Sequence, residues 1–195
     1  MSALLSRPAA TAPATKVAAF DAWLDKQAEP RLFELVDGAV VMIANPTETH
    51  NQIASNLHLW LKLAADAHGC RAYMSDMRVQ RSDSLDEINK SRPDVVVRCG
   101  PNTGKTFVTD PVIVVEVLSP STMDIDRGLK PDFYKSLPTL QHIVLAYQDQ
   151  MRVEHYRLDG DTWVTDVWHQ RSDVLAMPAY GVETTLDAVY FGLDV

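Results

Sequence analysis

The sequence has no long hydrophobic run, few cysteines and more acidic than basic residues. No apolar stretch in its 195 residues approaches the roughly 20 that a membrane-spanning helix needs. Cys70 and Cys99 have no metal-binding spacing and no disulfide framework, so we expect free thiols in a cytoplasmic protein. Lys and Arg number 18 against 26 Asp and Glu. The net charge of -8 argues against sequence-independent binding to nucleic acid through a basic surface.

The chain is long enough to bury a sizeable core, and its apolar content of 46% is typical of a globular protein. Residues 1–15 are rich in Ala, Pro, Ser and Thr and lack the basic start and continuous apolar stretch of a secretory signal. We therefore expect a flexible tail over 1–15 and a single domain over 16–195. The acidic total does not exclude an enzyme acting on DNA, because carboxylates around a metal site contribute to it.

The spacing of apolar residues predicts three helices and a larger number of strands. Helices are expected over 17–27, from Thr47 or Thr49 to Gly69, and over about 126–136. Apolar runs joined at Asp37-Gly38 predict a hairpin. The predicted strands cover 32–36, 39–43, 71–80, 94–97, 111–118, 140–147, 152–158 and 162–169. This mixture predicts an α/β fold with a central mixed sheet flanked by helices.

Three acidic residues, Glu34, Asp94 and Glu116, lie in or beside the most apolar predicted strands. An unpaired carboxylate buried there would cost several kcal/mol, so something positive is expected to meet each one. Mg²⁺ and Mn²⁺ prefer oxygen ligands, and one or two carboxylates with water suffice to bind them. Lys130, on the helix after the Glu116 strand, is a candidate for a cation near the same point. This set of residue types suits the hydrolysis of a phosphodiester.

Four strings in order carry a family resemblance: Glu34-Leu35-Val36-Asp37-Gly38, Arg92-Pro93-Asp94-Val95-Val96-Val97, Val115-Glu116-Val117-Leu118-Ser119-Pro120-Ser121-Thr122 and Asp126-Arg127-Gly128-Leu129-Lys130. Together they resemble the Uma family of restriction-endonuclease-like proteins, within the PD-(D/E)xK nucleases, from about Phe20 to Tyr190.

The resemblance implies a restriction-endonuclease-like fold and a metal-dependent endonuclease that hydrolyses DNA phosphodiester bonds with Mg²⁺ or Mn²⁺. It implies that Asp94 and Glu116 hold the metal, that Glu34 is a third acidic member and that Lys130 is catalytic. The nuclease signature expects a lysine two residues after the second acid, where this chain has Leu118. The family supplies this cation from the following helix, which corresponds to Lys130 here.

Each candidate also has a structural alternative. Asp94 could accept a backbone hydrogen bond at a strand start, and Glu34 could point into solvent from the hairpin. Lys130 could face water beside Arg127. Glu116 could form an ion pair with Arg92 or Arg78. His50, at the start of the second predicted helix, could assist a phosphate or a water, or could only close the helix end.

Two classes of function remain open on the sequence. One is the endonuclease, for which a homodimer is compatible with cutting two strands. The other is a non-catalytic nucleic-acid-binding or assembly module that retains the nuclease fold. The absence of lysine at position 118 and the acidic composition favour the second.

Overall fold

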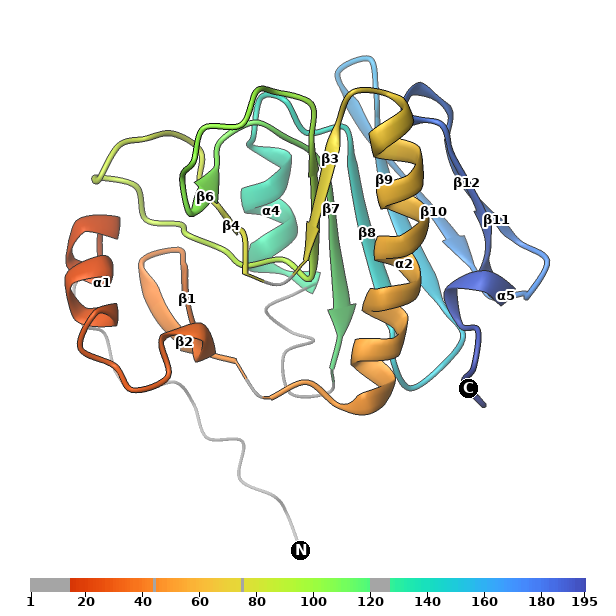
Figure 1. The fold of residues 1–195 in the computed structure, drawn as a ribbon, viewed down its shortest axis with the longest axis horizontal. Helices are drawn as coiled ribbons and strands as arrows, with labels where there is room; N and C mark the ends of the chain where they lie inside the picture. Colours follow the sequence, from red (N-terminus) through yellow and green to blue (C-terminus); the bar gives the residue numbers. More distant parts are fainter. Residues whose placement is uncertain (1–14, 44, 75, 120–126) are drawn as a thin grey trace, which may run out of the picture.

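The computed structural model describes residues 15–43, 45–74, 76–119 and 127–195. Its centre is a six-stranded sheet with the order β10-β9-β8-β7-β5-β3 (Figure 1). β7 and β8 run parallel, and the other neighbouring pairs in this sheet are antiparallel. The strands are β3 (Arg71–Met74), β5 (Val95–Arg98), β7 (Pro111–Leu118), β8 (His142–Tyr147), β9 (Val153–Asp159) and β10 (Thr162–Trp168). The predicted mixed sheet is confirmed.

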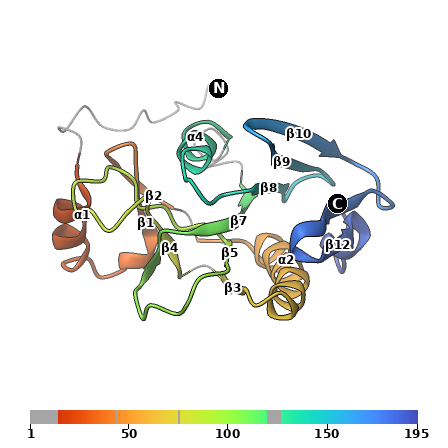
Figure 2. The same cartoon turned by 90° about the horizontal axis from the view of Figure 1, so that it is seen from above.

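Helices α2 (Glu48–Ala67) and α4 (Leu129–Lys135) cover opposite faces of this sheet, as the view from above shows (Figure 2). Side chains alternate between faces along a strand. In β7, Val115 and Val117 pack in the core beneath α2, whereas Val114 and Leu118 pack with α4. Glu116 therefore lies on the α4 face, between two residues that point the other way.

Helix α2 begins where the sequence predicts. Thr47 is its N-cap, and the Thr47 hydroxyl accepts a hydrogen bond from the His50 backbone N–H at 3.1 Å. The helix buries a stripe of apolar side chains against the sheet: Ile53, Ala54, Leu57, Leu61 and Ala65. Trp60, predicted to belong to this stripe, is 39% exposed because it lies at the edge of the buried face. Gly69, with a φ of 71°, turns the chain into β3.

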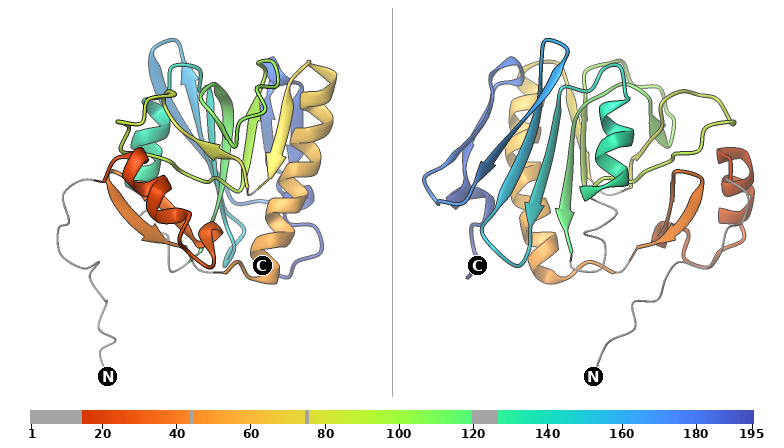
Figure 3. Two further views of the ribbon diagram at one scale, coloured as in Figure 1. Left: turned by 60° about the vertical axis from the view of Figure 1, so that its left-hand side comes forward. Right: turned by 180° about the vertical axis from the view of Figure 1, so that it is seen from behind.

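The N-terminal part forms a separate layer beside the sheet, made of α1 (Val17–Leu24), the 3₁₀ turn η1 (Pro30–Leu32), β1 (Phe33–Val36) and β2 (Ala39–Met42) (Figure 3). Positive φ angles of 47° at Asp37 and 72° at Gly38 give the tight hairpin that this pair predicts. A bridge between Leu35 and Lys90 joins β1 to the segment that leads into β5. The N-terminal layer therefore contacts the chain close to Asp94.

Two predictions of strand structure are wrong. The strand predicted over 71–80 is divided into β3 and β4 (Arg78–Val79), and β4 pairs in parallel with β6 (Phe107–Val108), within a predicted loop. The C-terminal region, expected to be irregular, contains the hairpin of β11 (Val174–Met177) and β12 (Val182–Thr185), followed by α5 (Leu186–Val189). The β4–β6 pair joins segments that are distant in the chain, so local patterns carry little signal for it. The β11–β12 hairpin is local, but its strands have only four residues each and Pro178 and Gly181 lie between them.

The prediction of free thiols is wrong, because Cys70 and Cys99 form a disulfide. Arg71 pairs with Arg98 in the antiparallel β3–β5 ladder, so each cysteine lies one residue beyond this pair and faces the other. The linear spacing could not show this, because it does not say which strands are neighbours.

Residues 1–14 and 126 lie outside the described residues, so the predicted tail and helix start are not placed. None of the helices in the described ranges is long and apolar enough to cross a membrane.

Candidate active site

Lys130 lies between two carboxylates in the interior. Its ammonium is 3.0 Å from Oε1 of Glu34 and 3.2 Å from Oε1 of Glu116. The three side chains are at most 7% exposed. The alternatives of a solvent-facing Glu34 and a water-facing Lys130 are therefore wrong. Helix α4, the N-terminal hairpin and β7 each contribute one of these charges, so the site forms only when the three layers pack together.

Tyr134 and Ser91 complete this group, and sequence analysis missed both. The Tyr134 hydroxyl donates to Oε1 of Glu116 at 2.5 Å and lies 2.6 Å from the Ser91 hydroxyl, which is 3.1 Å from Oε2 of Glu34. Two hydroxyl protons serve three contacts, so Ser91 donates to either Tyr134 or Glu34. Burial, and then the charge of Glu116, raise the pKa of Tyr134 well above its ordinary value. Tyr134 therefore stays protonated and remains a donor.

The sequence did contain a signal for Tyr134. It lies four residues after Lys130 on the same helix, and residues at that spacing share one face. The position of Lys130 therefore predicts that Tyr134 faces the same site. Ser91 carries no comparable signal, because its approach to Glu34 depends on the Leu35–Lys90 and Val79–Ser91 bridges.

Asp94 immediately precedes β5, and its side chain is 18% exposed. Its Oδ2 accepts a hydrogen bond from the Val117 backbone N–H at 2.7 Å and lies 3.3 Å from Nε2 of His50. The backbone hydrogen bond considered as an alternative is thus present, although it comes from the neighbouring strand. His50 is held by the first turn of α2 and contacts a predicted metal ligand rather than only closing the helix.

Asp94 and Glu116 occupy facing positions at the ends of adjacent strands. Val95 pairs with Val115 in the antiparallel β5–β7 ladder, so Asp94 and Glu116 are each one residue beyond that pair. The structure brings Glu34, Glu116 and Lys130 into direct contact. Asp94 lies beside them in the ladder but contacts other groups, the His50 ring and the Val117 backbone N–H. Their carboxylate oxygens match the donor preference of Mg²⁺ and Mn²⁺, which need one or two carboxylates and complete their shell with water. No group of three His, Cys, Asp or Glu side chains able to hold a metal occurs within the described ranges.

Arg78 and Arg92, considered as ion-pair partners of Glu116, contact the N-terminal layer instead. Arg78 donates to the carbonyls of Phe33 and Pro30, at 3.0 and 3.2 Å, and Arg92 donates to the carbonyl of Arg31. That alternative for Glu116 is therefore wrong.

A mixed sheet between helices, with acids at adjacent strand ends and a lysine beside one of them, defines a restriction-endonuclease-like protein. The fold is similar to that of a crystal structure described as a "putative nuclease belonging to DUF820" from Anabaena variabilis ATCC 29413. The TM-score is 0.69 at 16% identity, over 88% of this chain and 96% of that chain.

Residues 17–188 match Uma2, described as "Putative restriction endonuclease", and the chain belongs to this family. Two relatives come from Synechocystis sp. (strain ATCC 27184 / PCC 6803 / Kazusa). The uncharacterized protein slr1290 is 31% identical over 190 residues, covering 95% of this chain and 96% of that protein. The uncharacterized protein sll1609 is 33% identical over 132 residues, covering 66% and 73%.

Proposed function

We propose that the protein is a metal-dependent endonuclease that hydrolyses DNA phosphodiester bonds at a centre made by Glu34, Asp94, Glu116 and Lys130. The observation that carries this proposal is the position of Lys130. Its ammonium reaches Glu116 from α4, at 3.2 Å, although the residue two positions after Glu116 is leucine. A lysine from α4 thus contacts Glu116, the acid beside which the nuclease signature places its lysine.

Asp94 and Glu116 are the residues that would hold Mg²⁺ or Mn²⁺. A bound ion of this kind lowers the pKa of its water and stabilises negative charge on a phosphate oxygen. Lys130 donates hydrogen bonds from its ammonium and stabilises negative charge beside Glu116. Glu34 holds Lys130 in place from the opposite side, and Tyr134 fixes one oxygen of Glu116.

Plasmid nicking with Mg²⁺ or Mn²⁺ tests this function. We expect nicked and linear products from the wild-type protein and a loss of at least 100-fold in rate for Glu116→Gln and Asp94→Asn, given the usual weight of electrostatic groups. Glu183→Gln, an exposed acid on β12, is the matched control and should cut as the wild type does. Equal nicking by wild type and Glu116→Gln would refute the assignment.

A second candidate is a nucleic-acid-binding or assembly module without catalysis. The ion pairs of the buried Lys130 with two buried carboxylates favour this candidate, because such a network can have a purely structural role. In that case DNA is bound but stays intact with every divalent metal tried, and Glu116→Gln changes stability without changing the DNA.

A further inference from the structure

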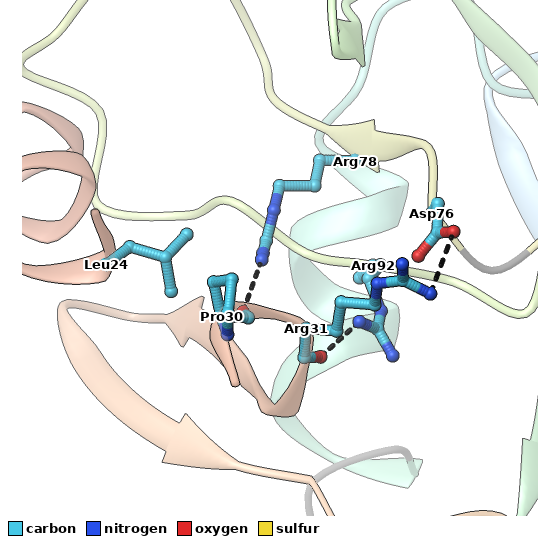
Figure 4. Close-up of a pocket in the computed structure, with 6 residues that line it drawn as sticks. All are labelled: Leu24, Pro30, Arg31, Asp76, Arg78 and Arg92. Atoms are coloured by element: carbon cyan, nitrogen blue, oxygen red, sulfur yellow. Dashed lines mark hydrogen bonds and ion pairs between the residues drawn. The ribbon is translucent and has the colours of Figure 1, made fainter. Parts of the chain in front are cut away.

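A hollow of about 190 Å³ lies between the N-terminal layer and the segments leading to the sheet (Figure 4). Its lining combines two apolar side chains with three guanidinium groups and a single carboxylate: Leu24, Pro30, Arg31, Asp76, Arg78 and Arg92. The lining therefore carries an excess of positive charge in a protein whose net charge is -8. Such a local excess is the opposite of what the overall composition predicts.

The arginines are partly held by the protein and keep donors for a ligand. Within the part of the chain that the structure describes, Arg92 makes one hydrogen bond, from Nη1 to the Arg31 carbonyl. A guanidinium has five N–H donors, so Arg92 can still offer two nitrogens. Arg31 is 75% exposed and lies 3.7 Å from Asp76, which is 66% exposed. That ion pair is weak and can yield to a stronger anion.

The positively charged guanidinium groups of Arg78 and Arg92 lie near each other in the lining of the hollow. Burial, followed by the nearby positive charge of Arg92, lowers the pKa of Arg78, while the carboxylates of Glu34, Asp21 and Asp76 act in the opposite direction with smaller effects. Arg78 is only 9% exposed and also stacks over the Phe20 ring at 5.6 Å, so it cannot swing away into solvent. An anion in the hollow would offset the repulsion between Arg78 and Arg92, and arginine suits phosphate because its planar fork can donate two parallel hydrogen bonds.

The hollow and the candidate active site share their backbone segments. Arg92 follows Ser91, which contacts Glu34, and lies two residues before Asp94. Arg78 holds the carbonyl of Phe33, the residue before Glu34. The backbone segments that these arginines belong to or hold therefore also carry the proposed catalytic acids Glu34 and Asp94, one or two residues away.

We propose that Arg31, Arg78 and Arg92 bind a backbone phosphate of the DNA strand, next to the phosphodiester that is presented to Asp94 and Glu116. This inference rests on the proposed function and adds a site that positions the strand. It also explains how an acidic protein can take a polyanionic substrate: a local group of arginines, rather than the net charge, receives it.

Fluorescence anisotropy with a short labelled duplex, in EDTA so that nothing is cut, tests the proposal. We expect Arg31→Gln and Arg92→Gln to weaken binding about tenfold each, as the loss of a charge-assisted hydrogen bond predicts. The slope of log affinity against log salt should fall by roughly one for each variant. Asp76→Asn should change binding in the opposite direction, because it removes the competing carboxylate. Arg171→Gln, which breaks an exposed pair with Asp187, is the matched control and should bind as the wild type does.

Wild-type affinity and salt slope in both arginine variants would overturn the proposal. So would micromolar binding of inorganic phosphate by calorimetry, because it would identify a free anion as the ligand. The proposed function fails separately. If the arginine variants lose affinity but the wild type never cuts DNA with Mg²⁺ or Mn²⁺, the phosphate site stands and the endonuclease does not. If the wild type cuts and the arginine variants bind DNA normally, the endonuclease stands and the phosphate site does not.

Discussion

Lys130 shows how a charge is accommodated in a protein interior. Its long side chain reaches two carboxylates from different layers. Tyr134 donates to the same Glu116 oxygen that Lys130 contacts, and the Ser91 hydroxyl lies against the other oxygen of Glu34. Removing one member of such a set leaves the others without compensation, which costs more than the intact set contributes.

We expect Lys130→Met to lower the free energy of unfolding by about 3–5 kcal/mol, because it leaves two carboxylates buried together. Urea unfolding followed by circular dichroism measures this. Lys62→Met is the matched control: Lys62 pairs with Asp66 in an exposed i, i+4 position, so its loss should change stability by less than about 0.5 kcal/mol. Equal midpoints for wild type and Lys130→Met would contradict the buried placement.

The half-buried His142 and the buried His155 form a second polar pair, on the face away from Lys130. Nδ1 of His142 lies 2.8 Å from Nε2 of His155, and the His155 ring stacks on Trp168. Burial, with the nearby charge of Arg157, lowers the pKa of His142 to about 4, and burial, with His142 next to it, lowers the pKa of His155 to about 3. Both rings are therefore neutral in the folded protein at pH 6.

Stability should decrease as the pH falls below 6.5, because the unfolded chain then takes up protons that the folded rings refuse. Between pH 7.5 and 5.5 we expect each ring to account for roughly 1 kcal/mol of this loss. Urea unfolding at both pH values should show a smaller loss for His155→Leu than for wild type. His169→Gln, which changes an exposed histidine, should show the wild-type loss, and a wild-type loss in His155→Leu would contradict the lowered pKa.

For single residues, the sequence predicts which acidic side chains are buried better than it predicts which groups form hydrogen bonds or ion pairs with them. Glu116 among Val114, Val115 and Val117 had to be buried, and the structure confirms it at 3% exposed. The partner of Glu116 depends on how α4 is rotated over β7, which local spacing does not define. Tyr134 and Ser91 were missed for the same reason.

Elements with a strong local pattern match their predictions closely. The Asp37-Gly38 hairpin, α2 with its Thr47 cap and the Val-rich β7 each rest on signals within a few residues. Elements that need distant partners do not match. The β4–β6 pair joins residues about 30 apart, a contact that no pattern in either segment encodes.

The disulfide, like the β4–β6 pair, joins segments that are distant in the chain, because it requires β3 to lie beside β5. Without reductant, the unfolded protein should show no reactive thiols, and after reduction it should show two. Cys99→Ser should lower the free energy of unfolding by about 2–5 kcal/mol under non-reducing conditions, because the cross-link no longer restricts the unfolded chain. Thiol titration in denaturant and urea unfolding measure the two effects.

Wild-type protein kept in reductant is the control for this variant, and it should unfold at nearly the same urea concentration as Cys99→Ser. Two reactive thiols in the unreduced protein would show that the cysteines are not joined.

For the molecule as a whole, the fold class and the family could be predicted from the sequence, since the four strings occur in order over most of the chain. The arrangement of the N-terminal layer could not. Its hairpin brings Glu34 to Lys130, and its 3₁₀ turn contacts Arg78 and Arg92. The same N-terminal layer therefore contributes to both the group around Lys130 and the arginine-lined hollow. The net charge of the chain could not predict that hollow, because it sums all charged residues and does not show where the arginines gather.

The proposed endonuclease requires Asp94 and Glu116 to act together on one divalent ion. Calorimetric titration of the full chain with Mn²⁺ tests this most directly, with Glu183→Gln as the control that should bind as the wild type does. We predict one Mn²⁺ per chain for the wild type, and a loss of this binding in Asp94→Asn and in Glu116→Gln while both remain folded. Unchanged Mn²⁺ binding in either folded variant, or none in the wild type, would show that Asp94 and Glu116 do not form a metal site.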